Sequence, residues 1–403
     1  MAPSSPSGSS PRSPRESPRG SPRGSPRGSP RASRRSGRKG GRRGRKNRRE
    51  DEADSSEEDL LLKEKMSVPD RTQLRTMVSG RHFHVRDFNY GRALGTGTFA
   101  VVRVVEWKGA EDEDTPPVAL KTMSKMQLVQ TNQVDHVKAE KTLMESFDCP
   151  FIVAFLKSFQ DERRVFLLLE FAHGGEVYGR LKRDGRLPVL DSKFYAAEIV
   201  LALQYLGSHS VAYRDFKPEN VLIDWRGHIK LTDFGFAKRI PQGEFAFTLV
   251  GTPEYLAPEV ITSAGHNAAA DFWALGVLLF EMLAGYPPFY DPSPFEIYRK
   301  ILSGIVKYPR HFDVKAVNLL EHLLTADIGG RFGHLDMMGH IFFDFVDWRK
   351  LGEQRIKPPW RPRLEDPRDA GQFEAVPDDK ALDGYDDCEP ITLKLNKVFV
   401  GAF

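Results

Sequence analysis

Two carboxylates, an amide and a lysine are grouped within residues 213–235 of this 403-residue chain. Asp215, Lys217, Asn220 and Asp233 are set between short leucine-rich and β-branched runs, which is typical of a loop held between strands with its polar side chains directed at one site. This set suits phosphoryl transfer to a hydroxyl group, in which Asp215 takes the hydroxyl proton and Lys217 steadies the moving phosphoryl group. Asn220 and Asp233 offer the hard oxygen atoms that magnesium prefers. The alternative interpretation is a polar surface hairpin.

A glycine-rich turn upstream, at 94–102, lies between two strand-like runs. Glycines let the backbone approach phosphate oxygens and donate its amide hydrogens to them. The turn precedes Lys121, which ends an apolar run, and Glu140, on a helix expected over 133–147. In this order Lys121 is expected to bind the inner phosphates while Glu140 pairs with it. Each feature alone has an ordinary explanation: a glycine hairpin, a strand-edge lysine or a solvated helix face.

The surrounding pattern changes from strands to helices along the chain. The apolar strand at 166–171 runs into a glycine-containing break, which suits a hinge that binds the adenine edge through backbone hydrogen bonds. Beyond it, helical spacing of apolar residues predicts helices over 192–208, 269–284 and 316–326. Strands followed by helices predict an α+β fold with a small β-rich lobe and a larger helical lobe. The folded part is expected to begin near Phe83.

A loop threonine downstream of an Arg-Asp pair suggests a switch. Phosphate on Thr248 is expected to be gripped by Arg214, Lys238 and His136, which would order the loop. The alternative is an ordinary exposed threonine.

The net charge of +4 hides an asymmetry. Residues 1–50 hold 16 Lys and Arg against two acids, whereas the remaining 353 residues hold 43 against 53, so the folded part is expected to be acidic. Two distant cysteines, Cys149 and Cys388, make no disulfide framework, which favours a cytoplasmic or nuclear compartment. No apolar run approaches the length of a membrane span. The first residues fit neither a signal peptide nor a myristoylation site.

Residues 1–59 are expected to form a disordered basic tail that ends in an acidic junction. Ser-Pro-Arg-Gly repeats three times over 17–28, and the tail has too few apolar residues to offset the entropy of ordering. Three interpretations stay open: a solubilising tail, an arm for nuclear targeting or nucleic-acid binding, and a tail phosphorylated at its Ser-Pro pairs. Residues 60–87 are expected to form a linker or a short helix.

Taken together, the motifs resemble the AGC group of serine/threonine protein kinases, and among them the catalytic subunits of cAMP-dependent protein kinases. The matching motifs are Tyr213-Arg214-Asp215 and the runs at 233–238, 251–259 and 284–289. The resemblance extends from about Phe88 to Phe403. It implies a two-lobed kinase domain over 88–342, with ATP in the cleft, two magnesium ions and a serine or threonine acceptor. Residues 343–403 would form the C-terminal tail of that group.

Site residues are carried over position by position. The positions implied for the nucleotide are Gly95, Gly97, Thr98, Phe99, Val102, Ala119, Lys121, Glu170, Ala172, Glu176 and Phe373. The resemblance also implies that Asp271 braces the catalytic loop, that Glu259 pairs with Arg331, and that Thr252 bonds near Asp215. In the tail, Phe399 and Phe403 would dock on the small lobe, and Thr392 is an implied phosphosite.

Substrate preference is implied in the same way. Family positions that select arginines upstream of the acceptor are occupied by Glu176, Glu219, Glu254 and Glu281, and carboxylates suit guanidinium groups. Leu249 would favour a hydrophobic residue just after the acceptor. The implied partners are basic protein substrates and a regulatory subunit or pseudosubstrate inhibitor released by a cyclic nucleotide.

Several positions depart from the family pattern. Ala100 stands at the third loop glycine, Phe216 at a leucine, Phe272 at a tryptophan, Val250 at a cysteine and Val376 at a tail tyrosine. The last aromatic pair is spaced by four residues instead of three, and the tryptophan-bearing helix that usually precedes the domain is not evident. None of these changes removes a catalytic group. The alternative function is a pseudokinase scaffold that binds nucleotide and partners without turnover, and a third is a chain whose basic tail is its main functional element.

Overall fold

The computed structural model describes residues 66, 68–97, 99–108, 115–376 and 391–403. The expectations for the basic tail, for Thr98 and for Cys388 lie outside these residues.

Five antiparallel strands form the sheet of the small lobe, in the order β1-β2-β3-β5-β4. The strands are β1 (Phe88–Thr96), β2 (Ala100–Trp107), β3 (Val118–Ser124), β4 (Phe155–Gln160) and β5 (Arg164–Glu170). Irregular pairing interrupts β1 between Tyr90 and Gly95, and the glycine-rich turn then joins β1 to β2. The predicted strand at 166–171 is β5, displaced by one or two residues.

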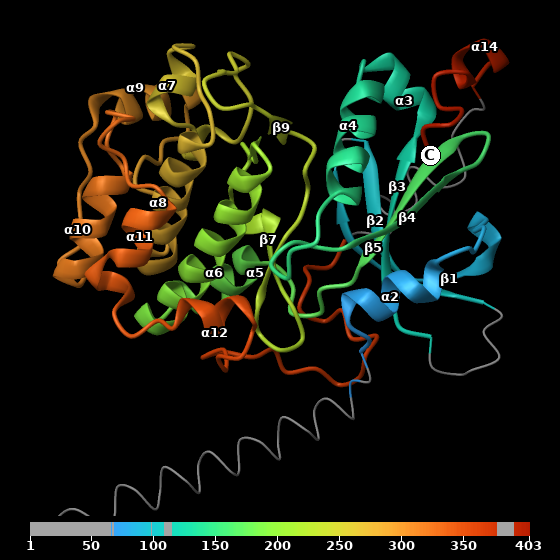
Figure 1. Ribbon diagram of the computed structural model, residues 1–403, viewed down its shortest axis with the longest axis horizontal. Helices are drawn as coiled ribbons and strands as arrows, with labels where there is room; N and C mark the ends of the chain where they lie inside the picture. Colours follow the sequence, from blue (N-terminus) through green and yellow to red (C-terminus); the bar gives the residue numbers. More distant parts are fainter. Residues whose placement is uncertain (1–65, 67, 98, 109–114, 377–390) are drawn as a thin grey trace, which may run out of the picture. The chain divides into compact units, whose positions relative to one another are not determined.

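Alternation along the strands sends side chains to two apolar layers, one on each face of the sheet. Ala119 and Leu167 point into the layer that includes α4 (Val134–Glu145), which follows the short helix α3 (Lys125–Gln130). Leu120 and Leu168 point into the other layer, which is closed by α2 (Arg71–Val78) (Figure 1).

The folded part therefore begins earlier than Phe83. Leu74 and Val78 of α2 are buried against the sheet, so burial of one apolar face fixes this helix. A helix does precede the domain, although it carries no tryptophan. The single-turn helix η1 (Val85–Asp87) then leads into β1.

The large lobe is helical. Its helices are α5 (Val177–Asp184), α6 (Val189–Ser208), α7 (Pro258–Ile261), α8 (Ala269–Ala284), α9 (Pro294–Ser303), α10 (Val314–Leu323), α11 (His334–Gly339) and α12 (Trp348–Gly352), with short turns at η2 (Pro218–Asn220), η3 (Pro253–Tyr255) and η4 (Ile341–Phe343). Helix α8 has the predicted bounds and is buried along almost its whole length. Helix α6 begins three residues earlier than predicted, and α10 spans 314–323 instead of 316–326.

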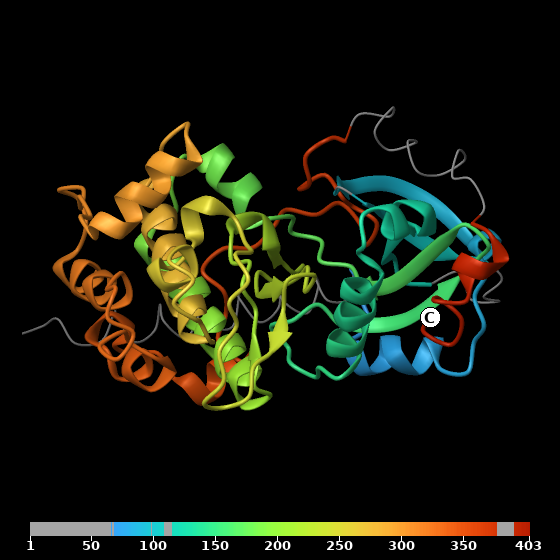
Figure 2. The same cartoon turned by 90° about the horizontal axis from the view of Figure 1, so that it is seen from above.

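Two small two-stranded ladders follow α6 along the chain. They pair β7 (Val221–Ile223) with β8 (Ile229–Leu231) and β6 (Val211–Ala212) with β9 (Lys238–Arg239). These ladders carry the polar stretch at 213–235. The architecture is the two-lobed α+β fold that the order of patterns predicted (Figures 1 and 2). No helix in the described part of the chain is long and apolar enough to cross a membrane.

The C-terminal segment contacts both lobes. Arg92 of β1 donates to the Phe373 carbonyl at 2.8 Å, and Lys182 of α5 forms an ion pair with Glu374 at 2.7 Å. Figure 2 shows this red segment passing from the helical part to the sheet. Near the end, α14 (Leu393–Asn396) precedes Phe399, which is fully buried, and Gln160 of β4 donates to the Phe399 carbonyl at 3.0 Å.

Candidate active site

Asp271, near the start of α8, holds the loop that carries the candidate base. Its buried carboxylate accepts hydrogen bonds from the backbone nitrogens of Tyr213 at 2.9 Å and Arg214 at 2.8 Å. Burial raises the pKa of Asp271 to about 6, against the opposing effect of these two donors. Arg214 has a positive φ of 68°, a conformation that costs energy in a non-glycine residue and is kept here by these contacts. Asp271 thus braces the loop as the sequence suggested.

Asp215 is 3% exposed and is held by three side chains. Its Oδ2 accepts from Lys217 Nζ at 3.0 Å and from Asn220 Nδ2 at 2.9 Å, and its Oδ1 accepts from Thr252 Oγ1 at 3.1 Å. Donors on both oxygens fix the rotamer of this carboxylate. Phe216, the unusual aromatic neighbour, is buried and packs 4.7 Å from the Tyr213 ring without displacing this network.

Lys121, Glu140 and Asp233 come together from β3, α4 and the loop after β8. Lys121 Nζ lies 2.7 Å from Glu140 Oε1 and 3.5 Å from Asp233 Oδ1. Burial favours the neutral lysine, but the charges of Glu140 and Asp233 outweigh it and raise the pKa of Lys121. The Lys121 charge in turn lowers the pKa of Asp233, so this group is ionised at neutral pH. The predicted pairing of Lys121 with Glu140 is present.

The oxygen atoms near Asp233 fit a magnesium ion. Asp233 is half exposed, and its Oδ2 accepts no hydrogen bond from the described residues. Asn220 gives its amide nitrogen to Asp215, which leaves its oxygen for a cation. Thr232 donates to the Asn220 carbonyl at 3.1 Å, so the two ligand loops are joined. Among the described residues no cluster of three His, Cys, Asp or Glu side chains could hold a metal.

The glycine-rich turn leaves room for phosphate. Gly97 N donates to the Ala100 carbonyl at 2.7 Å and closes the turn, and neither Gly95 nor Gly97 has a left-handed backbone. A Cβ atom on Gly95 would meet nothing within 4 Å, so the glycine at this position is not required by the protein's own packing. Such open space suits a ligand that approaches the backbone closely. Thr98, at the tip, lies outside the described residues.

The other positions implied for the nucleotide fall on the same face of the small lobe and on the hinge. Val102 and Phe99 are partly buried, and Ala119 and Ala172 are buried. Phe373 packs 6.1 Å from the ring of Phe171, which begins the hinge. The tail residue expected to cover the nucleotide is therefore beside the hinge.

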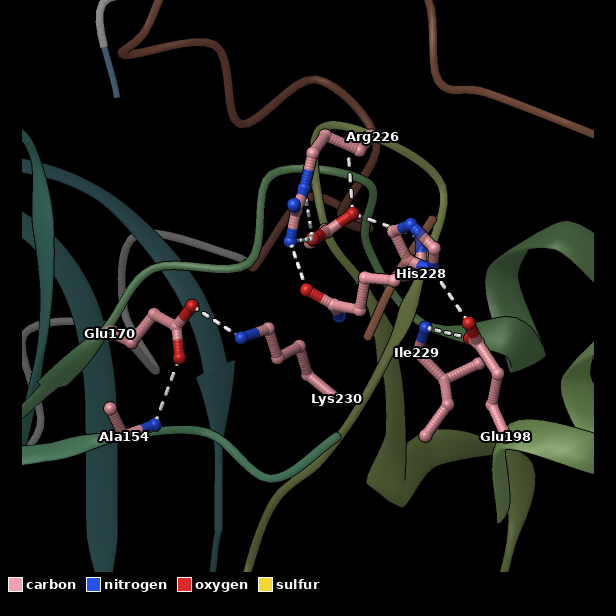
Figure 3. A network of polar contacts seen from close by, with 9 residues as sticks. Ala154, Glu170, Glu198, Arg226, His228, Ile229 and Lys230 are labelled. Carbon is pink, nitrogen blue, oxygen red and sulfur yellow. Dashed lines mark hydrogen bonds and ion pairs between the residues drawn. The ribbon is translucent and has the colours of Figure 1, made fainter. Parts of the chain in front are cut away.

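The side chain of Glu170, next to the hinge, forms an ion pair with the strand that precedes Asp233. Sequence patterns did not indicate this contact. Lys230 Nζ of β8 lies 2.6 Å from Glu170 Oε1, and Ala154 N donates to Glu170 Oε2 at 2.9 Å (Figure 3). The Lys230 side chain is only 4% exposed. A strand reading Ile229-Lys230-Leu231 predicts a half-exposed lysine, so only the tertiary structure reveals its partner.

A second polar group in Figure 3 fixes the β7–β8 turn. Asp224 accepts from the backbone of Arg226 and His228, both at 2.9 Å. His228 Nδ1 lies 2.5 Å from the buried carboxylate of Glu198 in α6, which also accepts from Ile229 N at 2.9 Å. The turn before the metal loop is thereby attached to the large lobe.

The four glutamates predicted to select arginine influence one another electrostatically. Burial, and then the charge of Glu219, raises the pKa of Glu176 to about 7. Burial also raises the pKa of Glu281 to about 7, with Glu219 and Glu254 adding to it and a hydrogen bond from Tyr255 opposing it. Glu219 itself has a raised pKa, mainly through burial. When ionised, carboxylates that repel one another in this way favour a bound cation.

Thr248 lies where the switch was expected, but only part of the predicted grip is present. Arg214 Nη1 donates to Thr248 Oγ1 at 3.1 Å, and Arg214 Nε donates to the Phe236 carbonyl at 2.7 Å. His136 pairs with Gln133 instead, at 2.8 Å. No contact in the described part of the chain joins Lys238 to this threonine. Leu249 beside it is 52% exposed.

Glu259 and Arg331 form a buried two-point ion pair, as the resemblance implied. Arg331 donates to the two carboxylate oxygens at 2.6 and 3.0 Å, and its guanidinium lies 5.4 Å from the centre of the Trp273 ring. This pair anchors the segment that contains Thr252 to the helical core.

Comparison with known proteins agrees with this geometry. A sequence profile described as the protein kinase domain matches residues 88–343. The chain is 45% identical over 304 residues to a cAMP-dependent protein kinase catalytic subunit of Dictyostelium discoideum, covering 74% of this chain but 46% of that protein. It is 41% identical over 322 residues to the human cAMP-dependent protein kinase catalytic subunit PRKX, covering 79% of this chain and 87% of the relative. The Schizosaccharomyces pombe catalytic subunit is 41% identical over 302 residues, with 73% and 58% covered. The chain thus spans about half the length of the first and third relatives and most of the human one.

Proposed function

Because this chain belongs to the protein kinase family and is a serine/threonine protein kinase similar to catalytic subunits of cAMP-dependent protein kinases, we propose that it phosphorylates arginine-rich sequences. The reaction is transfer of the γ-phosphoryl group of MgATP to a serine or threonine with arginines upstream and a hydrophobic residue downstream. The observation that carries this proposal is the Asp215 carboxylate with three donors, next to four half-buried glutamates. We assign 88–342 to the kinase domain and 343–403 to its tail.

The proposed mechanism follows from the contacts of Asp215, Lys217 and Lys121 in the structure. The acceptor hydroxyl gives its proton to Asp215 while its oxygen forms a bond to the γ-phosphorus, and the bond from that phosphorus to the β–γ bridging oxygen breaks. Lys217, 3.0 Å from Asp215, offsets charge on the moving group. Lys121 binds the inner phosphates and is held in place by Glu140. Magnesium, when bound by Asn220 and Asp233, supplies positive charge that neutralises the phosphate oxygens.

Substrate selection is assigned to the large lobe. Glu176, Glu219, Glu254 and Glu281 would bind guanidinium groups, and the exposed Leu249 would contact the residue after the acceptor. Peptides that differ only by arginine or alanine upstream of serine test this assignment. Phosphate incorporation should fall at least ten-fold without the arginines, because each charge-assisted contact is worth roughly 1.5–3 kcal/mol. Equal incorporation would contradict the specificity while leaving the transfer reaction intact.

The nucleotide site is supported separately by the open space at Gly95 and by the position of Phe373 beside the hinge. The pseudokinase alternative is not favoured, since Lys121, Asp215 and Asp233 are present and in contact with their expected neighbours. A regulatory subunit or pseudosubstrate that competes for the glutamates is part of the proposal, because the relatives are named as catalytic subunits. A cytoplasmic or nuclear location is proposed on cysteine usage alone.

A further inference from the structure

Helix α2 has its own stabilising signals, although it lies outside the kinase profile. Asp70 Oδ1 accepts from Gln73 N at 2.9 Å, and Gln73 Oε1 accepts from Asp70 N at 2.8 Å, which forms a capping box. Leu74 and Val78 then bury one face of the helix against the sheet. The helix is therefore fixed in orientation, and its arginines are directed by the protein instead of moving freely in solvent.

Two arginines of α2 reach the loop that joins α4 to β4, residues 146–154. Arg75 donates to the Phe147 carbonyl at 2.7 Å and lies 3.1 Å from Asp148 Oδ1. Arg71 lies 3.3 Å from the same Asp148 oxygen and makes a longer contact, 3.5 Å, to the Ile152 carbonyl. Arg75 thus places positive charge beside a carbonyl just beyond the C-terminal end of α4, where such charge is favourable, and Arg71 adds an ion pair to the same loop.

The inner side of the same loop is in contact with the catalytic elements. Phe147 is 2% exposed, and its ring centre lies 5.2 Å from that of Phe234, which follows Asp233. Leu231 N donates to the Phe151 carbonyl at 2.8 Å, and Val153 N donates to the Leu231 carbonyl at 2.9 Å. At the end of the loop, Ala154 N donates to Glu170, the last residue of β5 before the hinge (Figure 3). The loop is therefore in contact with the metal loop and the hinge, and α2 covers it from outside.

We propose that Arg71 and Arg75 are positioning residues for catalysis, acting through the α4–β4 loop. By holding that loop, they keep α4 at the distance from β3 at which Glu140 pairs with Lys121, and they keep Phe147 against Phe234. The inference rests on the proposed phosphoryl transfer. If α2 only shielded the sheet, its apolar residues alone would suffice and the arginines would be dispensable.

The test compares the variant Arg71→Ala/Arg75→Ala with Arg81→Ala in the full chain. Arg81 is an exposed arginine just after α2, and its side chain makes no hydrogen bond or ion pair with the described residues, so it controls for the loss of a nearby arginine that does not contact the loop. Hydrogen exchange of the amides of 134–154 is measured by mass spectrometry without nucleotide. Steady-state kinetics with MgATP and an arginine-rich peptide follow on the same preparations. Arg75→Lys, which keeps the charge but loses the planar fork, is the conservative variant.

Faster exchange over 134–154 is expected in the double variant and not in Arg81→Ala. We expect kcat to fall by roughly ten-fold, a size typical of residues that act on a site without touching its ligands. The KM for the peptide should stay within about two-fold, because the glutamates lie in the large lobe, and Arg75→Lys should recover part of kcat. Unchanged exchange, or faster exchange with unchanged kcat, would overturn the proposal. An inactive unmodified chain would refute the proposed function instead, and exchange would still decide whether the arginines hold the loop.

Discussion

Substrate selection by this chain should depend strongly on pH, because two of the glutamates proposed to bind arginine have pKa values near neutrality. Burial, followed by repulsion from neighbouring carboxylates, raises the pKa of Glu176 and of Glu281 to about 7 in each case. A raised pKa means that the carboxyl is neutral below pH 7 and charged above it. Binding of arginine is therefore present at pH 8 and is lost as the pH falls toward 6.

The size of the effect follows from the titration curve. For a pKa of about 7, the ionised fraction falls from about 0.9 at pH 8 to about 0.1 at pH 6, which is a roughly ten-fold loss for each carboxylate that binds a guanidinium. Tyr255 already donates to Glu281, so Glu176 is expected to contribute more. The combined loss should lie between about ten-fold and one hundred-fold.

The assay measures kcat/KM between pH 6 and pH 8 for an Arg-Arg-X-Ser peptide and for the same peptide with alanines at the arginine positions. The ratio of the two values removes any pH dependence of the transfer step itself, because both peptides share it. Glu176→Gln should lower the ratio at pH 8 and weaken its pH dependence to at most about ten-fold, since only Glu281 of the two glutamates still titrates. A ratio that stays constant from pH 6 to pH 8 in the unmodified chain would refute the reasoning.

Three further predictions concern the buried ion pairs and the metal. Lys230→Met should lower the free energy of unfolding by about 3 kcal/mol, because it leaves Glu170 without its charged partner. Urea titration should show that the double variant Lys230→Met/Glu170→Leu regains most of this lost stability. A double variant as unstable as the single one would argue against the pair. Arg331→Met should cost roughly 3–5 kcal/mol in the same assay, since Glu259 then remains charged in the core; a loss below about 1 kcal/mol would be too small for a buried pair. Chelation of divalent ions should abolish peptide phosphorylation and added magnesium should restore it, whereas turnover that persists in excess chelator would exclude the proposed roles of Asn220 and Asp233.

The elements that the sequence predicted well are those with strong local signals. Helix α8 consists of a long apolar run, and Gly285, with a positive φ of 88°, ends it, so its C-terminal limit follows from local chemistry. Helix α2 lies within the 60–87 segment that was expected to form a linker or a short helix, but its bounds could not be predicted, because it has only eight residues and two buried positions, Leu74 and Val78. Its position depends on the sheet it covers, which no local pattern reveals.

The candidate site could be predicted in composition but not in its supporting contacts. The order of Lys121, Glu140 and Asp233 along the chain indicated that they would meet. The partners of Lys230 and Arg75 could not be foreseen, because both contact residues on other elements through side chains that a pattern treats as solvated. The accommodation of Phe216 beside Tyr213 likewise depends on packing in three dimensions.

The central claim is that Asp215 takes the proton from a protein hydroxyl during transfer from MgATP. The most direct test is the rate of phosphate transfer to an Arg-Arg-X-Ser peptide by the unmodified chain and by Asp215→Asn, with MgATP binding measured in parallel. The account predicts turnover in the unmodified chain, and in the variant a loss of at least 10²-fold with nucleotide binding retained. Equal turnover in the two proteins would contradict the role of Asp215. No turnover in either, with MgATP bound and Thr248 phosphorylated, would show that the chain is a scaffold.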